Sequence, residues 1–216
     1  MAIPAGPDPA RADPTPSDPA RAESARAPSA RQAELLELAY GYALAHGLAD
    51  LSLRPLAAAI GSSPRVLLFL FGSKENLVRA LLGRSRADEL ALLAELRSAH
   101  PGADLATAAA AIWRWLAEPG RRDLLRLWAE GYARSLVEPS GPWAGFAAAT
   151  VQDWLDVLAT YQPAHDRPGP EAAAERTAVL AILRGALLDL LATGDEERVT
   201  AAVTSALAPH RQPPGR

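Results

Sequence analysis

Residues 53–77 read LRPLAAAIGSSPRVLLFLFGSKENL, and this stretch predicts two short helices joined by a tight turn. A first helix over residues 53–60 ends at Gly61, because glycine readily takes the left-handed conformation that closes a helix. Ser63 is a good N-cap for the second helix, and Pro64 stands at its first position, where a missing N–H costs least. So short a connection makes the two helices cross steeply, as in a helix-turn-helix unit.

The second helix is expected to have one buried and one outward face. Its apolar residues and those of the first helix predict a shared core of Leu56, Ile60, Leu67, Leu70 and Phe71. The outward strip then consists of Ser62, Arg65, Val66 and Phe69. One forked cation among hydroxyl and apolar groups suits a DNA major groove, where arginine bonds guanine and apolar groups touch thymine methyls. The same spacing also fits a purely structural corner between two helices.

A third helix follows at once and begins with an unusual cation. Ser73 caps this helix, and Lys74, the one lysine beside 21 arginines in the chain, stands in its first turn. The helix dipole disfavours a cation there unless an anion lies nearby, and a DNA phosphate would be that anion. A solvated lysine offset by Glu75 is the alternative.

Taken together, the residues from Arg31 to about Leu82 resemble the DNA-binding domain of the TetR family of bacterial transcriptional regulators. The resemblance rests on these runs: Ala45-His46-Gly47, Leu51-Ser52-Leu53-Arg54, Leu56-Ala57, Ile60-Gly61-Ser62-Ser63 and Phe71-Gly72-Ser73-Lys74-Glu75-Asn76-Leu77. It implies a homodimeric regulator that binds double-stranded operator DNA. The expected DNA-contacting residues are Arg31, Ser52, Arg54, Ser62, Ser63, Arg65, Val66, Phe69 and Lys74.

The sequence departs from the family pattern inside the second helix. The family usually has a phosphate-binding tyrosine there, and often a histidine just before the final phenylalanine. Here those places hold Leu68 or Phe69 and Leu70. The expected phosphate and base contacts therefore depend more on Arg65 and Lys74.

Composition and charge fit a small helix-turn-helix domain (residues 29–82), called the head, joined to a larger helical domain (residues 83–209), called the body. The 216 residues are 49% hydrophobic, contain no cysteine, and show neither a signal peptide nor a membrane-length apolar run, so we expect a cytoplasmic protein. Residues 1–30 carry net charge −1, residues 31–86 carry +3, and residues 87–216 carry −5. A basic head would favour contact with phosphate at one end of the molecule.

Turn residues divide the chain into four parts. We predict a Pro- and Ala-rich disordered arm (1–28), a helix-turn-helix domain (29–82), a helical ligand-binding and dimerisation domain (83–209) and a disordered tail (210–216). Ser29 and Gln32 form a predicted capping box that opens the first helix. The later helices are expected at 73–97, 104–118, 120–137, 142–161, 171–193 and 196–208. With nine helices and no alternating apolar pattern, the fold class is all-α.

The body is rich in aromatic residues surrounded by alanine and leucine. Large flat side chains among small ones either fill a core or leave an apolar cavity between helices. The resemblance favours the cavity, since TetR-like proteins commonly bind an effector in this region. The expected ligand-binding residues are Trp113, Trp128, Tyr132, Trp143, Phe146 and Trp154.

The stretch 179–191, VLAILRGALLDLL, is apolar nearly all round, interrupted only by Arg184, Gly185 and Asp189. Such a helix is buried on both sides, so we expect one side to face a second copy of the chain. The resemblance supports this, since the family dimerises through its last long helices. The expected interface residues are Trp154, Leu155, Leu158, Val179, Leu183, Leu187 and Leu190.

Catalytic and metal chemistry have little support in the sequence. The four histidines are scattered, no pair has metal-ligand spacing, and neither a phosphate-binding glycine loop nor a nucleophile elbow is present. We therefore predict no cofactor and no metal, and a transcriptional repressor released from a palindromic operator by a small apolar effector. Two alternatives remain: a helical small-molecule-binding or interaction protein without DNA binding, and a cofactor-free helical enzyme.

Overall fold

The computed structural model describes residues 19–208, with side chains described from Ala30 onward. Within this range the chain is helical and has no strand, which confirms the all-α class. The helices are α1 (Pro19–His46), α2 (Leu53–Ala59), α3 (Pro64–Phe71), α4 (Lys74–Ala99), α5 (Leu105–Ala117), α6 (Arg122–Val137), α7 (Phe146–Ala159), α8 (Pro170–Thr193) and α9 (Glu196–Leu207). No single helix in these residues is long and apolar enough to span a membrane, and only the bent α2–α3 pair meets that test jointly.

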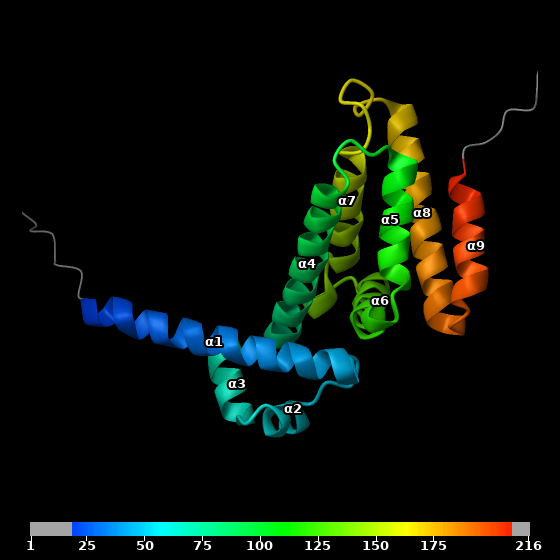
Figure 1. Ribbon diagram of the computed structural model, residues 1–216. Coiled ribbons are helices and arrows are strands. Elements are labelled where there is room, and N and C mark those ends of the chain that lie inside the picture. Colours follow the sequence, from blue (N-terminus) through cyan, green and yellow to red (C-terminus); the bar gives the residue numbers. More distant parts are fainter. Residues whose placement is uncertain (1–18, 209–216) are drawn as a thin grey trace, which may run out of the picture.

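The predicted helix-turn-helix is present at one end of the molecule (Figure 1). The axes of α2 and α3 are bent by 102° at their connection, and Gly61 takes the left-handed conformation there with φ +64°. The Ser63 hydroxyl accepts the Val66 N–H at 3.2 Å, and the Ser73 hydroxyl accepts the Asn76 N–H at 3.1 Å. These side-chain caps confirm the predicted starts of α3 and α4.

The three helices of the head and the start of α4 share one core. Its innermost side chains are Leu35, Ala39, Leu56, Leu67, Leu77 and Leu81. Of the core predicted between α2 and α3, Leu56, Leu67 and Phe71 are buried, whereas Ile60 and Leu70 are partly buried. The Gln32 side chain of α1 donates to the Leu70 carbonyl at 2.8 Å, which ties α1 to the end of α3.

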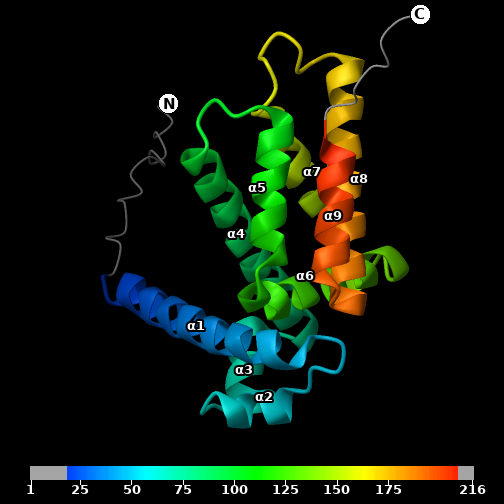
Figure 2. The ribbon, with the colours of Figure 1, turned by 45° about the vertical axis from the view of Figure 1, so that its right-hand side comes forward.

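The body is a bundle in which α4, α5, α7, α8 and α9 stand beside one another, while α6 crosses at the end nearest the head (Figures 1 and 2). Helix α4 belongs to both parts: its first turns pack in the head, and its later turns pack against the body. Ser85 and Glu89 lie among its buried residues. Helix α4 is therefore one continuous helix across the junction of head and body.

Two elements begin where the sequence did not predict. Helix α1 begins at Pro19, so Ser29 lies inside the helix and the predicted capping box there is wrong. The stretch 20–27, ARAESARA, is rich in strong helix formers, which accounts for the earlier start. Residues 1–18 of the predicted arm and the predicted tail 210–216 lie outside the described residues.

The predicted continuous helix over 142–161 is also wrong. A 3-10 helix occupies Gly141–Trp143, and α7 begins only at Phe146. Gly145 between them has φ +75°, a left-handed conformation that interrupts an α-helix. On the two sides of the break, the 3-10 helix packs against α4 and α6, and α7 packs against α4, α6 and α8.

Candidate nucleic-acid interface and buried pocket

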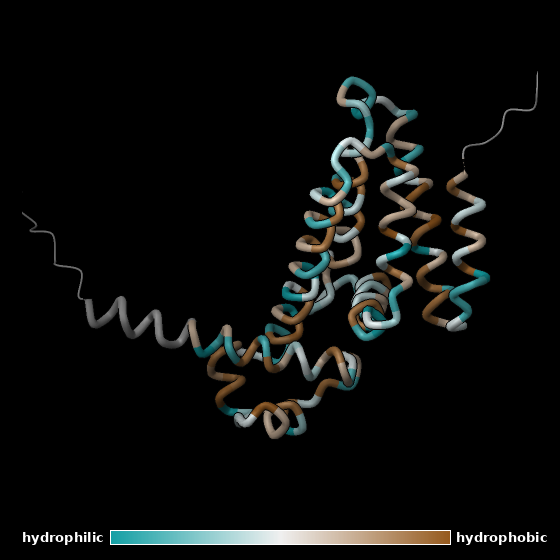
Figure 3. Tube along the Cα trace, viewed as in Figure 1, coloured by the Kyte–Doolittle hydropathy of each residue, from teal (hydrophilic) through white to brown (hydrophobic). Residues whose placement is uncertain are grey.

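Helix α3 is a predominantly hydrophobic segment at the end of the molecule that carries the head (Figure 3). Phe69 is 81% exposed, and Val66 and Leu68 are 39% and 42% exposed. Arg65 is exposed beside them, while Leu67 on the opposite face is buried. A surface of this kind, with one cation among large apolar side chains, is more typical of a binding site than of a solvated helix.

Two serines of the predicted contact set have other roles. The Ser62 hydroxyl is buried and has no hydrogen-bond partner within residues 30–208. Ser62 lies in the turn before α3, so its side chain does not continue the outward strip, and that part of the prediction is wrong. The Ser63 hydroxyl is engaged in capping α3.

The remaining predicted polar contacts gather near the start of α4. Ser52, Arg54 and Lys74 line one surface hollow together with Asp50 and Leu53. Helix α4 begins at Lys74, so the first N–H groups of this helix lie beside the same hollow. By contrast, Arg31 on α1 is paired with Glu34 at 2.6 Å. The geometry therefore brings Ser52, Arg54 and Lys74 together and leaves Arg31 apart.

The body holds an apolar pocket between its helices. Its lining residues are Ser85, Glu89, Leu92, Trp115, Leu116, Leu124, Leu125, Trp128, Trp154, Leu180, Leu183, Arg184 and Leu187. The cavity measures about 40 Å³, which is room for about three water molecules. A drug-sized ligand needs a pocket of roughly 300 Å³ or more. Side chains such as Trp128 and Trp154 must therefore move to admit one.

Only two of the predicted ligand-binding aromatics line this pocket, namely Trp128 and Trp154. Trp113 instead donates its indole N–H to the Thr200 hydroxyl of α9 at 3.0 Å. Trp143 lines a different surface hollow, next to Lys74 at the head. These two aromatics serve the packing of the molecule rather than the pocket.

Phe146 and Tyr132 flank the pocket without lining it. Phe146 packs so closely on Gly131 that a Cβ added there would lie 3.1 Å from its ring. The Tyr132 ring packs against the Trp128 ring in a tilted arrangement, at a centroid distance of 5.0 Å. The Arg184 guanidinium lies 5.1 Å from the Tyr132 ring centroid, a cation–π contact. Tyr132 thus positions one lining aromatic and one lining cation.

Two ionisable groups inside the apolar pocket escaped prediction as site residues. Glu89 is 9% exposed, and its carboxylate accepts the indole N–H of Trp154. Burial raises the pKa of Glu89 to about 7. Burial also lowers the pKa of Arg184 below its ordinary value. Both residues interrupt apolar stripes in the sequence, and this interruption is the signal that could have identified them.

Most of the residues predicted for the dimer interface lie inside the single chain. Trp154, Leu158, Val179, Leu183, Leu187 and Leu190 are buried within the single chain. Only Leu155 is partly exposed. Helix α8 buries one apolar side in the protomer, where α5, α6, α7 and α9 all contact it. The sequence showed correctly that α8 is apolar all round but did not show which side faces inward.

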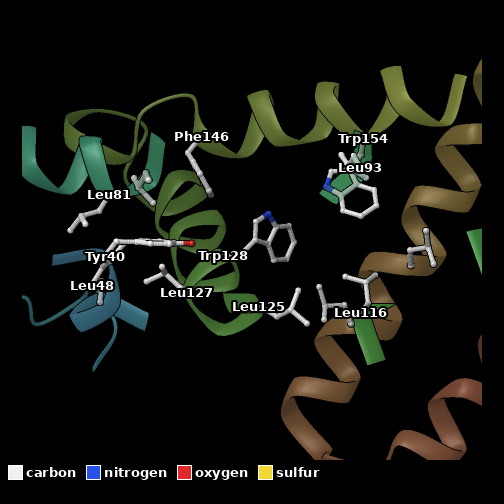
Figure 4. Close-up of a cluster of buried hydrophobic side chains, with 14 of the residues drawn as sticks. Tyr40, Leu48, Leu81, Leu93, Leu116, Leu125, Leu127, Trp128, Phe146 and Trp154 are labelled. Carbon is white, nitrogen blue, oxygen red and sulfur yellow. The ribbon is translucent and has the colours of Figure 1, made fainter. Parts of the chain in front are cut away.

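The pocket and the head are joined through α6. Figure 4 shows Leu127 on the side of Tyr40 and Leu48 of the head, and Trp128 on the side of Trp154 in the body. Two residues after Trp128, the Glu130 carboxylate accepts the backbone N–H of Leu48 at 2.8 Å. Consecutive residues of α6 therefore contact both functional regions.

The architecture defines a helix-turn-helix head joined to a helical body with an internal pocket, and solved structures share it. A transcriptional regulator from Rhodococcus sp. Rha1 matches with 22% identity and a TM-score of 0.66, covering 82% of this chain and 93% of its own. A putative TetR-family regulator from Rhodococcus sp. matches with 16% identity and a TM-score of 0.63, covering 83% and 97%. The multidrug binding protein EbrR, crystallised with imidazole, matches with 25% identity and a TM-score of 0.60, covering 84% and 92%.

These matches show that the chain has the fold of TetR-family transcriptional regulators, as the sequence resemblance predicted. The agreement extends over both the head and the body, because more than four-fifths of each chain is covered. No protein-family model and no curated protein sequence matches the chain.

Proposed function

We propose that the protein is a sequence-specific DNA-binding transcriptional regulator that represses its target until a ligand enters the pocket. The observation that carries the proposal is the exposed face of α3, where Arg65 lies among Val66, Leu68 and Phe69. An arginine reads guanine, and apolar groups read thymine methyls, in a major groove. The TetR-family fold supports this role for the helix.

Phosphate contacts would fix the head on the duplex. Lys74 and the N-terminus of α4 would offer one phosphate site, and Arg54 lies on the same hollow. Such contacts position a protein without reading sequence, whereas α3 supplies the base contacts. Phosphate binding at a helix N-terminus also relieves the unfavourable placement of Lys74 in the first turn.

A homodimer would present two copies of α3 to successive half-sites. The exposed side of α8 carries small and apolar residues at alternating spacings of four and three, namely Ala174, Ala178, Ala181, Gly185, Leu188 and Ala192. This spacing keeps one stripe in line along a partner helix, and small side chains allow close approach. We propose this stripe as the interface in place of the buried residues predicted from sequence.

Ligand entry would alter the head through α6 and α4. EbrR has been crystallised with proflavin, which supports a ligand-binding role for the corresponding body here. If Trp128 moves together with α6 to enlarge the pocket, Glu130, which contacts Leu48 of the head, moves with it. The ion pair of Arg84 on α4 with Glu37 on α1, at 2.6 Å, is a second link. Either movement would change the separation of the two recognition helices.

Selection of binding sites from random-sequence duplexes tests the proposal. A symmetric dimer with one recognition helix per protomer should select two inverted half-sites at a fixed spacing. Recovery of no preferred sequence, with DNA binding absent at low salt, would instead favour a ligand-binding protein whose helix-turn-helix is only structural.

A further inference from the structure

The pocket contains unsatisfied polar groups that its apolar walls do not explain. Within the described residues, no hydrogen-bond partner exists for Oε2 of Glu89, for Nε1 of Trp128, or for Nε and Nη2 of Arg184. All three side chains line the cavity. A buried polar group without a partner costs free energy, so such groups at one cavity indicate a missing ligand or water.

These groups do not satisfy one another. Oε2 of Glu89 and the two Arg184 nitrogens are unpartnered at the same time, so no hydrogen bond joins them. The other carboxylate oxygen of Glu89 is occupied by Trp154. A molecule that enters the cavity is therefore placed to meet a free carboxyl oxygen and a free guanidinium edge.

The unsatisfied set is dominated by donors. Trp128 offers one N–H, and Arg184 offers N–H groups on two adjacent nitrogens, against a single oxygen of Glu89. Adjacent guanidinium nitrogens form the fork that holds a carboxylate by two parallel hydrogen bonds. The remainder of the lining is almost wholly leucine and tryptophan, which suits an apolar body.

We infer that the pocket takes an apolar organic acid, whose carboxylate is held by the Arg184 fork and whose ring or chain lies among Trp115, Trp128 and Trp154. The inference rests on the proposed function, in which this pocket is the effector site. An organic cation is disfavoured, because it would be placed beside the guanidinium of Arg184 with only one free carboxyl oxygen in return.

The state of Glu89 is compatible with an anionic ligand. Its pKa of about 7 allows the Glu89 carboxyl group to take up a proton near neutral pH. The neutral group does not repel the carboxylate of a ligand, and its O–H can donate a hydrogen bond to that carboxylate. The charged groups that act on Glu89 are Asp153 of α7, Arg86 of its own helix and Arg184 of α8. Arg86 is held by Asp153 through two hydrogen bonds, at 2.5 and 2.8 Å, which leaves Arg184 as the cation available to a ligand.

Three probes with the same ring test this charge preference in the full chain. Calorimetric titration with 2-naphthoate, 2-naphthylmethanol and 2-naphthylmethylammonium should rank the anion first, at least about tenfold tighter than the cation. Equal binding of anion and cation, tighter binding of the cation, or no binding of 2-naphthoate would each overturn the inference. This comparison needs no variant.

A variant then assigns the preference to Arg184. Arg184→Met should weaken 2-naphthoate binding by at least about tenfold, because a charge-assisted fork is lost, and should leave the neutral alcohol within about threefold. Arg126→Met, which removes an exposed cation from α6, is the matched control and should change neither. An unchanged affinity of Arg184→Met for 2-naphthoate would overturn the inference.

Folding and DNA binding are monitored in the same samples. Binding of the neutral alcohol reports an intact pocket in Arg184→Met, and Arg184→Lys offers a milder change that keeps the charge but not the fork. If Arg184→Met does not fold, Arg184→Lys serves as the test variant. Its affinity for 2-naphthoate should fall by at least about tenfold, and an unchanged affinity would contradict the inference. Titration of the wild-type chain with duplex DNA separates the two proposals. Absence of DNA binding would refute the proposed role as a regulator, whereas the preference of the pocket for an anion would stand.

Discussion

The carboxylate of Glu130 on α6 accepts the backbone N–H of Leu48 at 2.8 Å, and this bond fastens the body to the head. Leu48 is buried in the core that includes the head, so its N–H has no access to water as an alternative partner. Because Trp128 lines the pocket from the same helix, this hydrogen bond connects a pocket-lining helix directly to the head.

Glu130→Ala should therefore destabilise the protein and weaken the coupling between the pocket and the head. Leaving the Leu48 N–H buried without an acceptor costs about 1–3 kcal/mol, measurable by chemical unfolding. Glu130→Gln keeps an acceptor oxygen and serves as the control, with a smaller loss expected. If Glu130→Ala unfolds at the same denaturant concentration as the wild type, the bond contributes no net stability.

Phe69→Ala should reduce DNA binding without affecting folding. Phe69 is largely exposed, so truncation removes few contacts and should change the free energy of unfolding by less than about 0.5 kcal/mol. Leu67→Ala on the opposite face should cost about 2–5 kcal/mol, since Leu67 is buried. Thermal unfolding and duplex titration of both variants distinguish the two faces. Unchanged DNA affinity in Phe69→Ala would remove the apolar face of α3 from the interface.

Gly131→Ala should destabilise the junction of α4, α6 and α7. An added Cβ would lie 2.7 Å from Cδ2 of Leu82 and 3.1 Å from the Phe146 ring. Overpacking of this kind costs about 1–3 kcal/mol. Gly83→Ala on α4 is the control, because nothing lies within 4 Å of a Cβ there, and alanine should be neutral or stabilising in a helix. Equal melting temperatures of the two variants would contradict the close packing at Gly131.

The pH dependence of stability should report on Glu89. Its folded pKa of about 7 lies above the ordinary 4.5, so the folded protein binds more protons than the unfolded chain between these values. Stability from this group is therefore highest at low pH and falls as pH rises from about 4.5 to 7, by on the order of 3 kcal/mol.

Glu89→Gln removes this titration and keeps an oxygen for the Trp154 N–H. Relative to the wild type, the variant should gain stability as the pH is raised from 5 to 8, as followed by chemical unfolding at each pH. A constant difference between the two proteins across this range would show that Glu89 does not titrate there.

Ala181→Glu tests the proposed dimer interface on α8. Ala181 is exposed in the single chain, so a glutamate there is tolerated by the protomer but places unpaired charge in the interface. We expect folded monomers by sedimentation. Ala110→Glu on α5, also an exposed helical alanine, is the matched control and should leave the dimer intact. A dimeric Ala181→Glu protein would exclude this stripe.

Local signals predicted much of the head correctly, because they depend on residues close in sequence. Ser63, Pro64 and Ser73 each set a helix start through a bond or a fixed angle within three residues, and Gly61 has the expected positive φ. Helix α1 begins before the apparent cap at Ser29, because the helix propensity of the preceding alanines outweighs that local signal.

Predicting which residues line the pocket and the dimer interface requires the direction of each side chain, and amino-acid composition does not give that direction. Trp113 and Trp115 are two residues apart, and only the second lines the pocket, since positions two apart on a helix do not share a face. Leu183 and Leu188 are both apolar residues of α8, yet the first is buried and the second is half exposed. Knowledge of the neighbouring helices is needed to separate such pairs.

The salt dependence of DNA binding tests the central claim most directly. The affinity for a duplex carrying the selected site is measured between 50 and 300 mM salt, for the wild type and for Lys74→Gln. We predict a steep linear fall of log affinity with log salt for the wild type, and a slope shallower by about one per Lys74 contact in the variant. An affinity that is independent of salt, or absent even at the lowest salt, would contradict the assignment of the head as a DNA-binding domain.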